Sequence, residues 1–137
     1  MTGYTLTARS PQGYDDTVAR VRELLADAGF GVLTEIDIRA TLKTKLDVDV
    51  PAQVILGACR PQLAHRALEA DPSIAALLPC NVVVREEADG VVVESVDPHV
   101  MVGMSAAADV VGEVADDART RLLGMLERVA ADGGAGS

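Results

Sequence analysis

The stretch NVVVREEADGVVVESV, residues 81–96, limits the possible folds more than any other part of the chain. Two valine-rich runs, 81–87 and 91–96, flank an Ala-Asp-Gly segment, which is typical of a β-hairpin. Because a tight turn joins antiparallel strands, at least part of the sheet is predicted to be antiparallel. Val82 and Val83 point to opposite faces of the strand, so both faces of the hairpin are apolar. A partner subunit or the C-terminal helix is therefore expected to cover the second face.

Strand and helix patterns alternate through the rest of the chain. Alternating apolar residues predict strands, and apolar residues at helical spacing predict helices. The predicted strands are 4–9, 30–37 and 52–59, and the predicted helices are 15–28, 38–46, 61–69, 73–78 and 106–131. With the hairpin, this order favours an α+β two-layer sandwich, in which helices pack on one face of a mainly antiparallel sheet of about five strands. A doubly wound parallel sheet is the alternative, because strands and helices alternate up to Asn81.

The length of 137 residues favours one domain with a single hydrophobic core. We assign this domain to residues 1–131. Residues 132–137, DGGAGS, carry no apolar side chain larger than alanine and are predicted to form a flexible tail.

The composition excludes several kinds of partner. The net charge of −9 opposes binding to nucleic acid, which relies on basic residues that neutralise phosphates. The sequence contains neither an apolar stretch long enough to span a bilayer nor the pattern of a signal peptide, so we expect no membrane partner and a cytoplasmic location. Thiols stay reduced in that compartment, which argues against a structural disulfide.

Three segments carry a resemblance to a known family. They are GFGVLTEIDIRATLKTKLDV, ILGACRPQLAHRALEADPSIAALLPCNVVVRE and DGVVVESVDP. Together they resemble the bacterial and archaeal domain of unknown function 302 family over roughly residues 4–100, which leaves the C-terminal helix largely outside. Arg60 departs from the family pattern, which usually has asparagine there. The resemblance implies a small α/β domain without an assigned activity.

The two cysteines are the first candidate for chemistry. Cys59 ends a predicted strand just before a helix, where the helix dipole and Arg60 favour a thiolate, and Cys80 opens the next strand. If those strands are antiparallel neighbours, the two thiols lie close together at one edge of the sheet. The alternative is that both are small buried hydrophobic residues. His65 and His99 do not complete a usual zinc spacing, so we predict no metal site and no cofactor.

A basic cluster is the second candidate. Lys43 and Lys45 are the only lysines of the chain, and together with Arg39 they concentrate positive charge on one predicted helix. These three residues are candidate ligands for a small anion, and the alternative is a solvated helix face balanced by nearby acidic residues.

No enzyme signature is present: the chain has no phosphate-binding glycine-rich loop, no nucleophile elbow and no HExxH motif. We therefore name no catalytic residue. The sequence favours a non-catalytic, homodimeric protein that binds or senses a small anionic ligand. One alternative is a thiol-dependent redox or soft-metal-handling protein that uses Cys59 and Cys80. The other is a structural module for protein interaction.

Overall fold

The computed structural model describes residues 3–132, so five of the six residues predicted as tail, 133–137, lie outside this range. Asp132 lies inside it, and its Oδ2 is 2.6 Å from Arg20 Nε. Helices and strands follow one another in the order β1 (Thr5–Ser10), α1 (Tyr14–Asp27), β2 (Gly31–Asp37), α2 (Ile38–Leu46), β3 (Gln53–Cys59), α3 (Pro61–Ala70), η1 (Pro72–Leu77), β4 (Cys80–Glu87), β5 (Gly90–Val96), η2 (Pro98–Met104) and α4 (Ala108–Ala131), where η1 and η2 are 3₁₀ helices.

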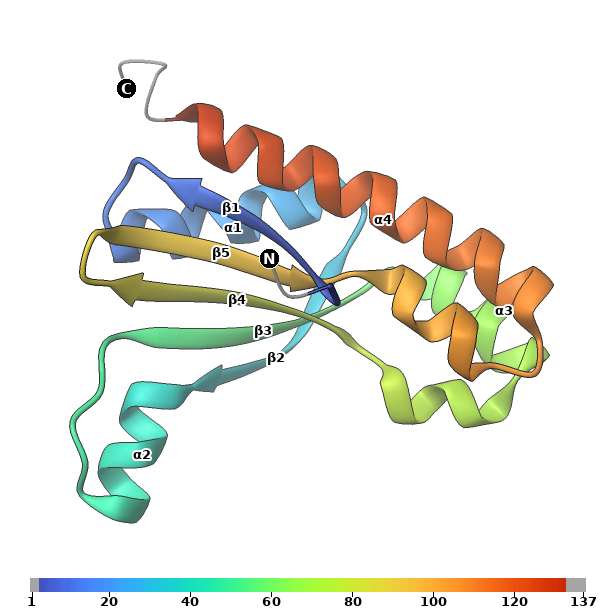
Figure 1. The fold of residues 1–137 in the computed structure, drawn as a ribbon, viewed down its shortest axis with the longest axis horizontal. Coiled ribbons are helices and arrows are strands. Elements are labelled where there is room, and N and C mark those ends of the chain that lie inside the picture. Colours follow the sequence, from blue (N-terminus) through green and yellow to red (C-terminus); the bar gives the residue numbers. More distant parts are fainter. Residues whose placement is uncertain (1–2, 133–137) are drawn as a thin grey trace.

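The strands form one sheet in the order β1-β5-β4-β3-β2, and all four neighbouring pairs are antiparallel. The predicted hairpin is β4 and β5, which pair from Glu87–Gly90 back to Val82–Ser95. The predicted α+β sandwich is confirmed, and the doubly wound parallel alternative is wrong. The strands β1 and β2, close in sequence, lie at opposite edges of the sheet (Figure 1).

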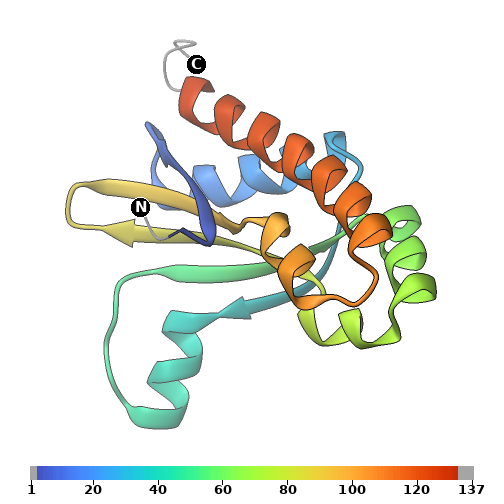
Figure 2. The same ribbon diagram turned by 45° about the vertical axis from the view of Figure 1, so that its right-hand side comes forward.

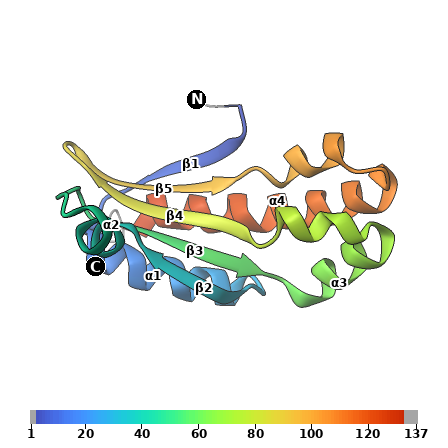
Figure 3. The same cartoon turned by 90° about the horizontal axis from the view of Figure 1, so that it is seen from below.

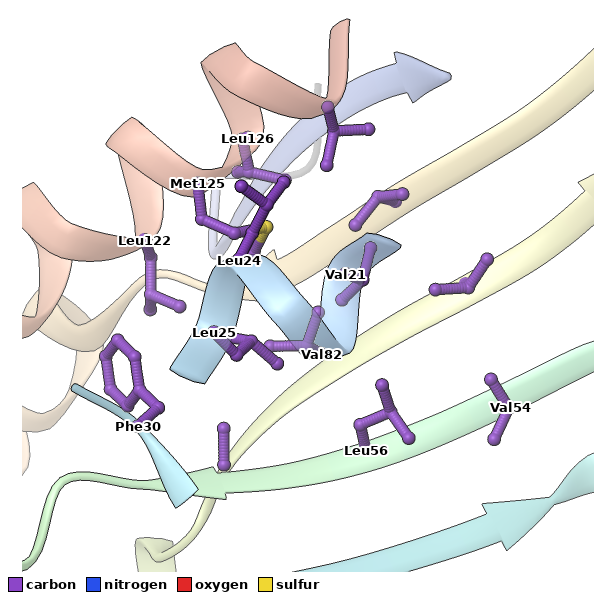
Figure 4. Close-up of a cluster of buried hydrophobic side chains, with 14 of the residues drawn as sticks. Val21, Leu24, Leu25, Phe30, Val54, Leu56, Val82, Leu122, Met125 and Leu126 are labelled. Carbon is purple, nitrogen blue, oxygen red and sulfur yellow. The ribbon is translucent and has the colours of Figure 1, made fainter. Parts of the chain in front are cut away.

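The main hydrophobic core lies between one face of the sheet and the helices α1 and α4. We call this the inner face (Figure 1). Side chains of the sheet, such as Leu56 and Val82, meet Leu25 of α1 and Leu122 of α4, and all four are fully or almost fully buried (Figure 4). Because the chain has a single phenylalanine and no tryptophan, aliphatic side chains supply nearly all of this core.

A second hydrophobic cluster lies beyond the end of the sheet. It contains Leu63 and Ala67 of α3, Ile74 of η1, Met101 of η2 and the first part of α4, including Val111 and Val114. Helix α4 is therefore shared: its first half packs against the second cluster and its second half against the sheet. Figure 2 shows α3, η1 and η2 gathered at one end, away from α2.

The opposite face of the sheet, which we call the outer face, has no helix layer. Seen from below, the strands lie in front of α1 and α4 (Figure 3). One of the two predicted covers for the second face of the hairpin was the C-terminal helix. Helix α4 packs on the inner face instead, so it does not cover the outer face. The outer face is polar around Glu94 of β5, where side chains of β1 and β4 bind it, and apolar where Val83 of β4, Ile55 of β3 and Ile36 of β2 lie side by side.

The polar part of the outer face is a hydrogen-bonded network around Glu94. The carboxylate of Glu94 accepts hydrogen bonds from Thr5 Oγ1 at 2.6 Å and from Arg85 Nη1 at 2.6 Å. The bond from Thr5 first, and then the contacts with Arg85, lower the pKa of Glu94 despite the opposing effect of burial. Glu94 therefore stays ionised, and this part of the face needs no further partner.

The apolar part is one row of side chains across three strands. Ile36 of β2 lies opposite Ile55 of β3, and Ile55 lies opposite Val83 of β4. Ile36 is exposed, and Ile55 and Val83 are only half-buried. Helix α2 stands beside this row and has no buried residue of its own. Its N-terminus is fixed because Asp37 accepts a hydrogen bond from the Ala40 backbone N–H at 2.9 Å.

No helix within residues 3–132 combines the length and the hydropathy needed to cross a membrane.

Candidate functional site

A small cavity lies where the two hydrophobic clusters meet. Its volume is about 30 Å³, which is room for about two groups of the size of a water molecule. Its wall is mainly apolar and takes residues from both clusters, including Phe30, Ala58, Leu63, Met101, Val114 and Ala118. Cys59, Arg60 and Cys80 complete the wall at the end of the sheet. An apolar wall with few polar groups is typical of small-molecule sites, but these usually measure about 300–1,000 Å³, so this cavity has room only for a very small apolar group.

Among the described residues, Arg60 is the only charged one in that wall. It links β3 to α3, as the residue that precedes the helix, and Pro61 occupies the first helical position. Its side chain is only 23% exposed, and its one ion pair within residues 3–132 is a long contact of 4.0 Å from Nη1 to Asp117 Oδ1. A largely buried guanidinium with so weak a counter-ion retains capacity for an additional anion.

Arg121 of α4 lies beside Arg60 and uses the same carboxylate. Its Nε is 2.5 Å from Asp117 Oδ1, and its Nη1 donates a hydrogen bond of 2.8 Å to the carbonyl oxygen of Ala28. This carbonyl belongs to the end of α1, where the helix dipole favours a cation. Two guanidinium groups thus share one carboxylate, which leaves one net positive charge in this cluster; Arg60 is its member that also lines the cavity.

Gly29 makes room for both arginine side chains. A Cβ atom at this position would lie 3.1 Å from Arg60 Nε and 3.5 Å from Arg121 Nη1. Gly29 also has a φ of +91°, the left-handed conformation that ends α1 and favours glycine. A glycine after the last turn is a common helix cap, whereas no local pattern indicates that two arginine side chains pack against it.

The two cysteines lie on neighbouring antiparallel strands, as their predicted placement requires. The register pairs Cys80 with Ala58, however, so Cys59 is offset by one residue. Both side chains nevertheless line the same small cavity, because Cys59 is the last residue of β3 and is not held by a continuing ladder. Both cysteines are free thiols.

Burial also opposes thiolate chemistry at these cysteines. It raises the pKa of Cys59, although this residue precedes a helix, and it raises the pKa of Cys80 to about 11, with a smaller contribution from Cys59. Since the thiolate is the reactive form, the geometry supports the packing alternative better than redox or metal chemistry. Within residues 3–132, no group of three or more His, Cys, Asp or Glu side chains is placed to hold a metal ion.

The predicted basic cluster lies on α2, and its three members do not converge. Lys43 Nζ is 2.9 Å from Asp47 Oδ1 and 3.5 Å from Asp49 Oδ1, so its charge is already balanced. Arg39 lies one turn before Lys43, whereas Lys45, two residues further, points to the other side of the helix. All three side chains are exposed to solvent. The geometry therefore supports Arg60 and Arg121 better than α2 as the place for an anion.

A larger hollow of about 710 Å³ opens at the other end of the sheet. Tyr14, Glu86 and Glu87 contribute to its wall, and burial, followed by nearby carboxylates such as Asp37, raises the pKa of Tyr14. This hollow has carboxylates and no cationic residue in its wall, so it does not suit an anionic ligand.

The pair of arginines was not predicted from the sequence. Arg60 stood out only because it departs from the asparagine of the resembling family and follows Cys59. Arg121 and Asp117 come from α4, far along the chain, and their spacing of four residues is that of an ordinary pair on a helix surface. Only the packing of α4 across the end of α1 brings them to Arg60.

Comparison with known proteins identifies relatives without assigned activity. The model of the family described as "Domain of unknown function DUF302" matches residues 6–129. The crystal structure of an uncharacterized conserved protein DUF302 from Bacillus stearothermophilus is 31% identical in sequence, with a TM-score of 0.84. The match covers 92% of this chain and 98% of that chain. None of the curated proteins matches the sequence. Because the family match extends to residue 129, it includes nearly all of α4, which the sequence resemblance left outside.

Proposed function

The chain belongs to the DUF302 family, and we propose that this member is a non-catalytic, homodimeric domain that binds a small anion at Arg60 and Arg121. The observation that carries the proposal is the meeting of two guanidinium groups over Gly29, with one carboxylate between them. An anion placed between Arg60 and Arg121 would balance the remaining charge and accept hydrogen bonds from rigid, planar donors.

An NMR titration with sodium formate, against sodium chloride at equal ionic strength, tests the anion site. We expect saturable shifts of the backbone amides of Gly29 and Arg60. R60Q is expected to weaken formate binding by about tenfold or more, because charge-assisted hydrogen bonds are lost. R66Q is the control, since Arg66 lies on α3, the helix that Arg60 precedes, and pairs with Glu113 at the surface. Shifts that do not saturate, or that are equal in R60Q and the unchanged protein, would contradict the proposal.

The apolar part of the outer face supports the homodimer. Ile36, Ile55 and Val83 form a row without charge on a protein whose net charge of −9 makes copies repel one another elsewhere. A helix of nine residues is marginal in water unless it packs against something, and α2 buries none of its side chains in the monomer. A second copy, related by a two-fold axis, would cover the row and α2 with the same surface.

The substitution L46E tests this interface. Leu46 ends α2 and is 66% exposed, so a charge there costs the monomer little, whereas at a dimer interface it is buried. We expect the unchanged protein to sediment as a dimer and L46E as a monomer. M104E is the matched control, because Met104 is also 66% exposed but lies on η2, at the other end of the molecule. A monomeric unchanged protein, or equal dissociation of M104E and L46E, would argue against this surface.

A further inference from the structure

We infer that the anion is a short-chain monocarboxylate, whose carboxylate binds Arg60 and whose apolar tail enters the cavity between the two hydrophobic clusters. The inference rests on the proposed anion site and adds the chemical class of the ligand. Its basis is that Arg60 belongs to the wall of the cavity as well as to the arginine pair. The charged and the apolar parts of the site are therefore adjacent.

The head group follows from the charge and the donors. Two guanidinium groups with one carboxylate between them leave a single positive charge, which matches a monoanion. A carboxylate fits the planar fork of a guanidinium through two parallel hydrogen bonds. Asp117 lies between the two arginines, and its charge disfavours a dianion such as phosphate or a dicarboxylate.

The tail follows from the wall of the cavity. Apart from Arg60, the side chains that surround it are aliphatic, aromatic or sulfur-containing, and Ala67, Val114 and Ala118 are buried. A second charged or polar group in that space would lose its hydration without gaining a hydrogen bond. Both thiols of the wall are held protonated by burial, so they add no charge that would repel the tail.

The length of the tail follows from the volume. About 30 Å³ accommodates roughly two groups of the size of a methylene or methyl. An aromatic acid is too large, since cavities that bind benzene are about 150 Å³. Acetate and propionate are therefore the probes whose tails fit, and hexanoate is the probe whose tail exceeds the space.

The experiment is an NMR titration of the full chain with formate, acetate, propionate, hexanoate and the uncharged propionamide. Each buried methylene group is expected to increase affinity about fourfold, so affinity rises from formate to propionate. Hexanoate is expected to bind no more tightly than propionate, and propionamide at least tenfold more weakly. Propionate is also expected to slow alkylation of Cys59 and to lose its affinity in R60Q.

The variant A64L tests the tail separately from the head. Ala64 is half-buried on α3 and lines the cavity, and leucine is a good helix former, so the larger side chain fills the space without breaking the helix. We expect A64L to bind formate as the unchanged protein does and to lose the gain of propionate over formate.

The possible negative results of these titrations distinguish an error about the tail from an error about the anion site. If formate binds through Arg60 but longer tails add nothing, or if hexanoate binds most tightly, the inference about the tail is wrong and the proposed anion site stands. If no carboxylate depends on Arg60, the proposed anion site is wrong as well. The chain-length series in the unchanged protein decides the inference even if A64L fails to fold.

Discussion

Replacing Gly57 by alanine is expected to lower the free energy of unfolding by about 3 kcal/mol or more, at the upper end of the cost of overpacking. Gly57 lies in the centre of the sheet, on β3, where it pairs with Thr34 on one side and Asn81 on the other. A Cβ atom there would lie 2.1 Å from Thr34 Oγ1 and 2.8 Å from Pro79 Cγ. Thr34 can relieve the first contact only by rotating its side chain, and the rigid ring of Pro79 leaves the second contact in place.

Urea unfolding of G57A measures this loss, and Gly124 provides the matched control. Gly124 lies in α4 and has no atom within 4 Å of an added Cβ, so G124A is expected to stabilise the protein by about 1 kcal/mol, since alanine favours the helix. The double variant G57A/T34A is expected to recover part of the loss by removing the nearest atom. An unchanged midpoint for G57A would mean that the sheet is looser at this position than the structure indicates.

Replacing Leu122 by alanine is expected to cost about 2–5 kcal/mol, the range for removing a large side chain from a rigid core. Leu122 is fully buried in the half of α4 that packs on the sheet, among Leu25 and Val82 (Figure 4). The cavity left behind lies between three elements that cannot all collapse into it. Urea unfolding again gives the difference in free energy.

The control for this substitution is L46A. Leu46 is a leucine on a helix as well, but it is exposed in the monomer. In L46A the monomer is expected to change in stability by no more than about 0.5 kcal/mol. Equal losses for L122A and L46A at low protein concentration would contradict the assignment of the core to the inner face.

Local structure was largely predictable from the sequence, because its signals are local. The helix predicted at 38–46 has the same limits as α2, since Asp37 caps its start. The hairpin and the end of β3 at Cys59 also agree within a residue. The segment 73–78 is predicted as a helix and forms the 3₁₀ helix η1, whereas no element is predicted where η2 lies, because short 3₁₀ turns have no apolar period to reveal them.

The candidate site was not predictable in the same way, because it depends on contacts between distant segments. No local pattern indicates that Arg121 reaches the end of α1 and meets Arg60 over Gly29. The offset of Cys59 from Cys80 depends on a register that a single residue changes, so sequence spacing could place the two thiols near each other but could not orient them.

The pairing of β1 with β5 affects folding during synthesis on the ribosome. Thr5 pairs with Val96, and within residues 3–132 the strand β1 pairs with β5 alone, so the first strand of this sheet to be synthesised pairs with the last. At ordinary rates of translation, the synthesis of the intervening chain takes on the order of ten seconds. During that interval β1 has no strand to pair with. The hairpin of β4 and β5 must form before β1 can join the sheet. Nascent chains therefore pass through a stage in which a short amphipathic strand is unpaired, and pairing between chains on neighbouring ribosomes is the risk at that stage.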